Sequence, residues 1–139
     1  MRIRTALISI VMPGLGQLLN LQYIKAITFL IIEHFINRLS HINQALYLDM
    51  NGLHKEALAV VNYEFAMFYP GFYVLVVLDA VINTKETKDT KFIYWFILSG
   101  MLGTMGIIYS RLITIPVFTV GFSMAVLMLI GTFHCSKNN

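Results

Sequence analysis

"VMPGLGQLLNLQYIKA", residues 11–26, interrupts the first apolar segment of the chain with a proline, two glycines and several polar side chains. The apolar run around it, Thr5–Leu19, has fifteen residues. A helix needs about 20 apolar residues to cross a bilayer. Proline removes a helical hydrogen bond, and glycine next to it weakens the helix further. This stretch therefore predicts a broken or re-entrant segment at the start of the chain.

The composition is that of a membrane protein. Of the 139 residues, 58% are hydrophobic and only 12% are charged, and the mean hydropathy is +0.72. Soluble proteins carry about 25% charged residues. The net charge of +3 comes from scattered basic residues without a stripe, so nucleic acid is not an expected partner. Cys135 is the single cysteine, which excludes an internal disulfide.

The apolar blocks predict one all-α membrane domain over residues 1–139, a polytopic helical bundle. A broken or re-entrant hairpin is expected over residues 5–39, and transmembrane helices over 65–82, 92–110 and 112–133. Between them, apolar positions recur at helical spacing against polar ones, which predicts an interfacial amphipathic helix over 51–64. Only Arg111 separates the last two segments, so they should form a tight helical hairpin.

Basic residues distinguish two topologies. If the first segment crosses the membrane, five of the ten Lys and Arg residues lie on each side of it. If the segment enters and returns, seven of them lie on one side and three on the other. In the second case Arg38, Lys55 and Arg111 lie opposite all the others. Basic residues concentrate in cytoplasmic loops. The expected protein is thus a multi-pass protein of a bacterial cell membrane with both termini cytoplasmic, and no Asn-x-Ser/Thr acceptor occurs.

A family resemblance rests on two pieces of the sequence. The first contains the hairpin residues Pro13, Gly14, Leu15, Gly16, Gln17, Asn20, Gln22 and Lys25, and the second is Asp79–Ala80. Together they resemble small bacterial membrane proteins related to the two-transmembrane-helix domain family, whose members are mostly uncharacterised. Leu21 and Ala26 stand where that motif has glycines. The resemblance implies a hairpin architecture, and it brings no catalytic residues and no cofactor.

Ionisable side chains inside apolar segments form the first candidate site. Glu33 lies in the apolar part of the hairpin, beside His34 and one helical turn before Asn37, and Asp79 lies in the 65–82 segment. Such groups are costly in a bilayer and often mark ion or proton paths. Two interpretations stay open: a structural polar clamp, or ion handling by Glu33 and Asp79 together.

Histidines offer a weaker signal. His34 and His41 are seven residues apart, hence on one helical face, and His134 neighbours Cys135. A metal or haem site needs ligands at more specific spacing than this. We therefore interpret them as interfacial histidines and expect neither a metal nor another cofactor.

Small residues recur along the 92–110 segment. They are Ser99, Gly100, Gly103, Gly106 and Ser110. Such spacing lets helices approach closely in lipid. Gly121, Ala125 and Gly131 offer a complementary surface on the last segment. This helix-packing face serves either contact within the hairpin or contact with a partner.

The function expected from these features is non-catalytic. No triad-like arrangement, phosphate-binding loop or paired carboxylates in a soluble cleft occurs in the sequence. The chain is expected to be an accessory subunit or scaffold whose partners are the lipid bilayer and either another membrane protein or further copies of itself. The alternative is a small ion or proton transporter or channel that uses Glu33 and Asp79; an enzyme built on His34, His41 and Glu33 is a third option.

Overall fold

The computed structural model describes residues 2–84 and 90–137, and all regular secondary structure in these residues is helical. This confirms the predicted all-α class. The elements are α1 (Arg2–Val11), α2 (Leu15–Leu19), α3 (Tyr23–Ser40), α4 (Ile42–Met50), α5 (His54–Val60), α6 (Tyr63–Ala66), α7 (Tyr69–Ile82), α8 (Ile93–Ile108), the 3₁₀ turn η1 (Ser110–Leu112) and α9 (Pro116–Lys137).

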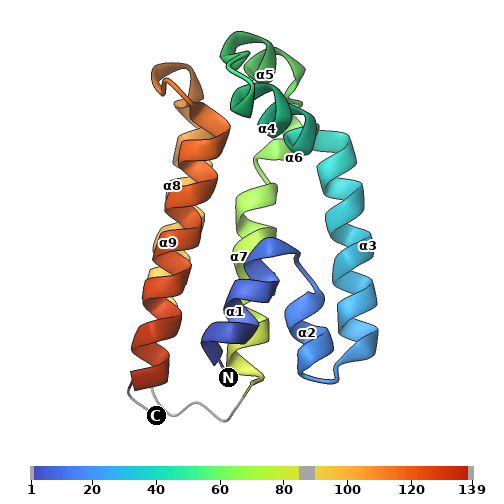
Figure 1. Cartoon of the computed structure of the whole chain (residues 1–139), viewed down its shortest axis with the longest axis vertical. Coiled ribbons are helices and arrows are strands. Elements are labelled where there is room, and N and C mark those ends of the chain that lie inside the picture. Colours follow the sequence, from blue (N-terminus) through green and yellow to red (C-terminus); the bar gives the residue numbers. More distant parts are fainter. Residues whose placement is uncertain (1, 85–89, 138–139) are drawn as a thin grey trace.

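The long helices α3, α7, α8 and α9 run along the long axis of the molecule (Figure 1). The three short helices α4, α5 and α6 cap its upper end, whereas α1 and α2 occupy only the lower half. The first helix starts, and the last helix ends, at the same lower end. Helix α8 packs against α7 and α9, and α1 also packs against both of these.

The chain reverses direction at Pro13–Gly14. Helix α1 ends at Val11, and Gly14 adopts the left-handed conformation, with φ 100°, before α2 runs back down (Figure 1). A Cβ on Gly14 would lie 2.8 Å from Leu30 Cγ and 2.9 Å from the Ala26 carbonyl oxygen. Both the backbone angle and the space therefore require glycine. The backbone of α1 and α2 thus reaches about half the height of the bundle and turns back (Figure 1).

The turn between α2 and α3 contains a non-glycine residue in the left-handed region. Leu21 has φ 59° and is 72% exposed. This is one of the two positions where the resembling motif has glycine. A left-handed conformation costs an L-residue roughly 1–2 kcal/mol, so Leu21 holds backbone strain that no buried contact of its side chain offsets.

Replacing Leu21 with glycine is expected to stabilise the fold by up to about 1 kcal/mol, because the relieved strain exceeds the extra entropy of an unfolded glycine. Thermal unfolding in mild detergent measures the effect. Leu19→Gly, at the last helical position of α2, is the matched control and should destabilise by up to about 1 kcal/mol. A lower unfolding temperature for Leu21→Gly than for the unmodified chain would contradict this account.

The predicted interfacial helix over 51–64 is wrong in detail. Two short helices, α5 and α6, replace it, because Val61 and Asn62 are extended. The Asn62 amide donates to the Ser40 carbonyl (3.0 Å), and its side chain accepts from the Glu64 amide (3.2 Å). The extended pair thus ties the cap to the end of α3 and begins a new helix with a side-chain cap.

Two helical stretches are long and apolar enough to cross a membrane: Tyr63–Ile82, which combines α6 and α7, and Pro116–Lys137. The last one begins four residues later than predicted, because Ile113 is extended and Pro116 takes the first helical position. Helix α8 has 16 residues and so is about 24 Å long, less than a hydrocarbon core of about 30 Å. Crossings by α3 and α8 stay predictions.

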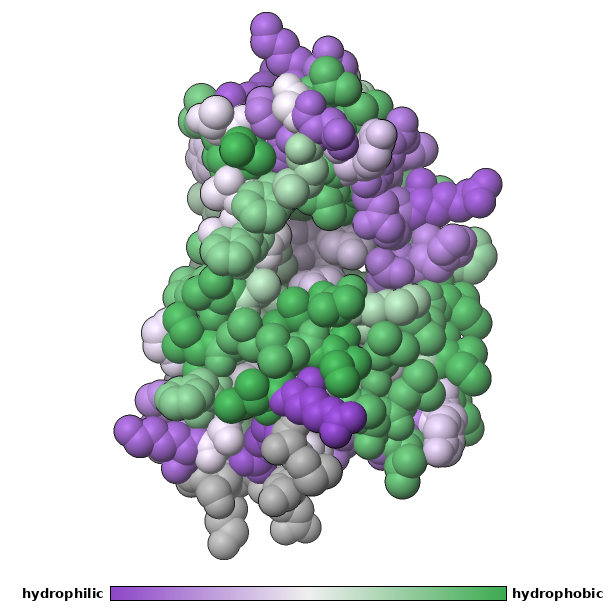
Figure 2. Space-filling model, in the orientation of Figure 1, coloured by the Kyte–Doolittle hydropathy of each residue, from purple (hydrophilic) through white to green (hydrophobic). Residues whose placement is uncertain are grey.

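The buried core lies among α1, α7, α8 and α9, with Phe92, Phe96 and Met128 as its largest buried apolar side chains. The outer surface is also strongly apolar. On the face shown in Figure 2, hydrophobic side chains cover the middle and much of the lower part, and hydrophilic ones gather at the upper end and along the lower edge.

Candidate functional site

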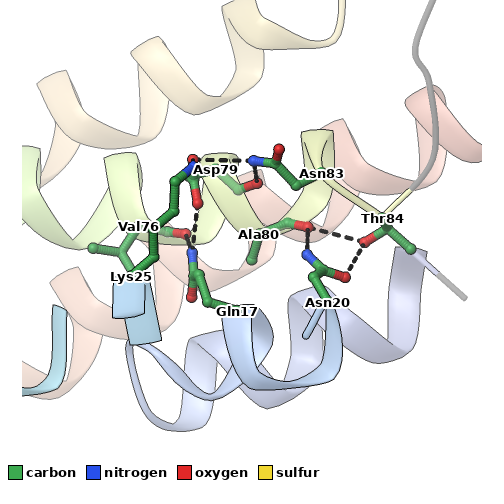
Figure 3. A network of polar contacts seen from close by, with 8 residues as sticks. All are labelled: Gln17, Asn20, Lys25, Val76, Asp79, Ala80, Asn83 and Thr84. Atoms are coloured by element: carbon green, nitrogen blue, oxygen red, sulfur yellow. Dashed lines mark hydrogen bonds and ion pairs between the residues drawn. The ribbon is translucent and has the colours of Figure 1, made fainter. Parts of the chain in front are cut away.

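The polar residues of the hairpin motif dock on the last turns of α7 (Figure 3). Gln17 is fully buried, and its Nε2 donates to the Val76 carbonyl (2.8 Å) and to Asp79 Oδ2 (3.0 Å). Asn20 Nδ2 donates to the Ala80 carbonyl (2.8 Å). A buried amide without such acceptors would cost free energy. These bonds therefore fix α2 to α7 at one register.

Asp79 is the centre of this network. Its Oδ1 accepts from Lys25 Nζ (2.8 Å) and from Asn83 Nδ2 (3.0 Å), and its Oδ2 accepts from Gln17. The side chain of Lys25 is 47% exposed and that of Asp79 is 25% exposed. Because water reaches both side chains, the ion pair contributes only modestly to the stability of the fold. Its geometry ties the first turn of α3 to the end of α7.

Close backbone packing completes the docking. A Cβ on Gly16 would lie 2.7 Å from Ala80 Cβ and 2.8 Å from Ser9 Cβ. Gly16 therefore lets α2 pass between α1 and α7. The backbone of Gln22 continues the turn, because its amide donates to the Gln17 carbonyl (2.9 Å). The two pieces of sequence that carry the family resemblance meet here, although more than fifty residues separate them.

The structure separates the two candidate carboxylates. Glu33 Oε1 accepts from Asn37 Nδ2 (3.3 Å) and from the Tyr69 hydroxyl (3.2 Å). His34 is exposed, and its ring lies edge-on to the ring of Phe35. Lys25, the partner of Asp79, precedes Glu33 by eight residues in α3, which is about 12 Å along a helix. Glu33 and Asp79 thus belong to different hydrogen-bond networks, whereas the predicted neighbours Glu33 and Asn37 are joined.

Sequence reasoning missed a buried carboxylate, Asp49. Its Oδ2 accepts from the backbone amides of Val117 (2.8 Å) and Phe118 (3.0 Å), and its Oδ1 lies 2.7 Å from His54 Nδ1. The side chain is fully buried. Asp49 therefore caps the N-terminus of α9 from another part of the chain, where the helix dipole favours negative charge. Its spacing of five residues from His54 was the one local signal in the sequence.

The small-residue face of α8 is occupied within the chain. Ser99 Oγ donates to the Met124 carbonyl (3.0 Å). A Cβ on Gly103 would lie 2.6 Å from Pro70 Cβ, and one on Gly106 would lie 2.7 Å from Val120 Cγ1. A Cβ on Gly100 would have only the Val74 side chain nearby, with Cγ2 at 3.9 Å. Ser110 is buried. Of the two roles open from the sequence, packing within the chain is the one observed at Ser99, Gly103 and Gly106.

Gly106→Leu is expected to destabilise the α8–α9 pair by about 1–3 kcal/mol, because the new side chain meets the branched side chain of Val120. Unfolding by a denaturing detergent measures the loss. Gly71→Leu is the matched control, since a Cβ at Gly71 has no neighbour within 4 Å. Equal stability of the two variants would show that α8 and α9 are not in close contact.

A cavity of about 320 Å³ lies above the tip of the N-terminal hairpin. Its floor is Ile10 near the end of α1, and its roof comes from the cap, including Ile42, Leu46 and Leu58. Residues of α7, α8 and α9 form the walls. Figure 2 shows a recess in the upper half of the face in view. The cavity exists because α1 and α2 reach only half the height of the bundle (Figure 1).

Two tyrosines line the α7 wall of the cavity. The rings of Tyr69 and Tyr73 stack with their centroids 5.8 Å apart. The Tyr69 hydroxyl donates to Glu33, and the Tyr73 hydroxyl donates to the Ile10 carbonyl. Both hydroxyls are therefore engaged inside the protein, and nearly all of the exposed lining is apolar. The arrangement can hold an apolar molecule.

No metal site accompanies the cavity or the network: within residues 2–84 and 90–137, no three His, Cys, Asp or Glu side chains are grouped to hold a metal ion. The distinguishing features of the described residues are a docked hairpin, a helix cap supplied by Asp49 and an apolar cavity.

Comparisons with protein-family models, with curated proteins and with solved structures find no match to this chain.

Proposed function

We propose that this chain is a multi-pass membrane protein that acts without catalysis, as an accessory subunit or scaffold of a membrane complex. The observation that carries the proposal is its apolar outer surface. Helix α3 alone exposes a stripe at helical spacing, formed by Ile24, Ile27, Ile31 and Phe35, and Ile24 is 85% exposed. Soluble monomers rarely expose contiguous apolar patches larger than a few hundred Å², whereas lipid covers such a surface in a membrane.

The distribution of basic residues supports one orientation. Among the described residues, the helix ends that share the lower end of the bundle carry Arg2, Arg4, Lys25, Lys91 and Lys137. The upper end carries Arg38, Lys55 and Arg111. Lys85 and Lys88, which the sequence assigns to the lower set, lie outside the described residues. Under the positive-inside rule the lower end, with both chain termini, is cytoplasmic.

The polar contacts favour a scaffold over a transporter. Asp79 is bonded to three side chains and Glu33 to two, and the two carboxylates lie in separate networks. A relay needs ionisable groups within reach of one another along a path. In this arrangement the carboxylates hold helices together. Because the face of α8 is filled internally, a partner protein would contact the outward surfaces of the bundle.

Reconstitution into sealed liposomes tests this function. We expect the protein to resist alkaline carbonate extraction, and proton and ion flux to equal that of empty liposomes. In particles extracted in mild detergent, the mass of the protein without its bound detergent should exceed that of a single chain, which is 15.8 kDa. Flux that falls in Glu33→Gln but persists in Glu56→Gln, an exposed carboxylate of the cap, would establish the transporter instead. Release by carbonate would contradict membrane insertion.

A further inference from the structure

We propose that the cavity above the hairpin is a binding site for one acyl chain of a membrane phospholipid. This inference rests on the proposed membrane function. Pocket volumes of about 300–1,000 Å³ are typical of small-molecule sites, and this cavity, at about 320 Å³, is at the lower end of that range. The occupant is identified by the depth of the cavity, the chemistry of its lining and the character of its rim.

The cavity spans the depth of one leaflet. Its α9 wall runs from Pro116, the first residue of the helix, to Ala125. Nine helical steps correspond to about 13 Å, close to half of a hydrocarbon core of about 30 Å. Ile10, at the turn of the hairpin, closes the cavity at that depth. A lipid of the leaflet at the capped end would therefore reach the floor with its tail.

The lining suits hydrocarbon. The hydroxyls of Tyr69 and Tyr73 already donate to protein acceptors, so a polar ligand would lose hydrogen bonds to water and regain few. Apolar cavities accept apolar guests.

The rim joins the cavity to the lipid-facing surface. Phe118 and Phe122 line the α9 wall and are themselves exposed, Phe122 by 60%. Their rings stack with centroids 5.8 Å apart. In the roof of the cavity, Leu46 of the cap is also partly exposed. An acyl chain thus enters sideways from the bilayer and exchanges its lipid neighbours for aromatic and aliphatic side chains.

The test uses phosphatidylcholine with a photoreactive diazirine in its acyl chain, incorporated into vesicles that contain the full-length protein. Peptide mass spectrometry maps the labelled residues. We expect saturable labelling at Phe118 and Phe122 that unlabelled phosphatidylcholine competes, together with non-saturable labelling of the α3 stripe. Gly121→Leu should reduce the saturable labelling at least fivefold, because Gly121 lines the cavity and its Cβ position is open.

Gly71→Leu is the matched control: Gly71 is also helical and open, but it is not among the lining residues, and labelling should stay unchanged. Saturable labelling that survives in Gly121→Leu would overturn the acyl-chain site. Labelling of the α3 stripe without labelling of the cavity would overturn the site but leave the membrane function intact. If neither region is labelled, both proposals fail.

Discussion

Replacing Gly16 with leucine is expected to lower the free energy of unfolding by about 3 kcal/mol or more. A Cβ at this position would meet Ala80 Cβ and Ser9 Cβ, both less than 3 Å away. These atoms are fixed to helix backbones, so neither can rotate away. Helix α2 must then move off α7, which costs about 1–3 kcal/mol of overpacking and the hydrogen bonds of Gln17 and Asn20 at about 1 kcal/mol each.

Unfolding by a denaturing detergent, followed by circular dichroism, measures this loss. Gly71→Leu makes the same chemical change in an open helical position and should leave stability nearly unchanged. Gln17→Leu, which removes the bonds without adding volume near Ala80, should give an intermediate loss. If Gly16→Leu unfolds at the same detergent concentration as Gly71→Leu, the hairpin does not dock on α7.

Asp49→Ala is expected to be the other strongly destabilising change, by about 3 kcal/mol. Pro116 has no amide hydrogen, so Val117 and Phe118 present the first free amides of α9, and Asp49 accepts from both. Hydrogen bonds to a charged acceptor are worth about 1.5–3 kcal/mol each. The substitution leaves two amides and His54 without this acceptor, and it releases the cap from the bundle.

Hydrogen exchange in detergent resolves this effect at the level of single amides. Protection at Val117 and Phe118 should fall sharply in Asp49→Ala and partly in Asp49→Asn, which keeps the shape but not the charge. His54→Ala is the matched control, since it removes one contact and leaves both amide bonds. Unchanged protection of these amides in Asp49→Ala would contradict the capping role.

The sequence was most informative where backbone chemistry is local. Pro13 and Gly14 predicted the break because their effects on a helix need no knowledge of the rest of the chain. The small residues of the 92–110 segment likewise pointed to close packing in the hairpin, which Gly103 and Gly106 show. Gln17 and Asp79 stand in the two separate stretches of sequence that carry the family resemblance, and the structure shows that their side chains are hydrogen-bonded.

The remaining features depend on contacts between distant parts of the chain. The acceptors for Gln17 and Asn20 include main-chain carbonyls of α7. Every residue has such a carbonyl, so the sequence of α7 does not reveal which of them accept. Asp49 meets amides 68 and 69 residues away, so its local spacing from His54 pointed to the histidine contact and not to its role as the cap of α9. The cavity arises from the half height of the hairpin beneath the cap, and this relation follows only once all helices are placed.

The central claim is that α1 and α3 begin on the same side of the membrane. Cysteine labelling from the two faces of sealed vesicles tests it most directly. In a Cys135→Ser background, single cysteines at Ile3, Tyr23 and Ser136 should react with an impermeant maleimide from one face of sealed vesicles, and cysteines at Asn51 and Arg111 from the other. This is the pattern of a hairpin that enters the bilayer and returns. Reaction of Ile3→Cys and Tyr23→Cys from opposite faces would show that the first segment crosses completely.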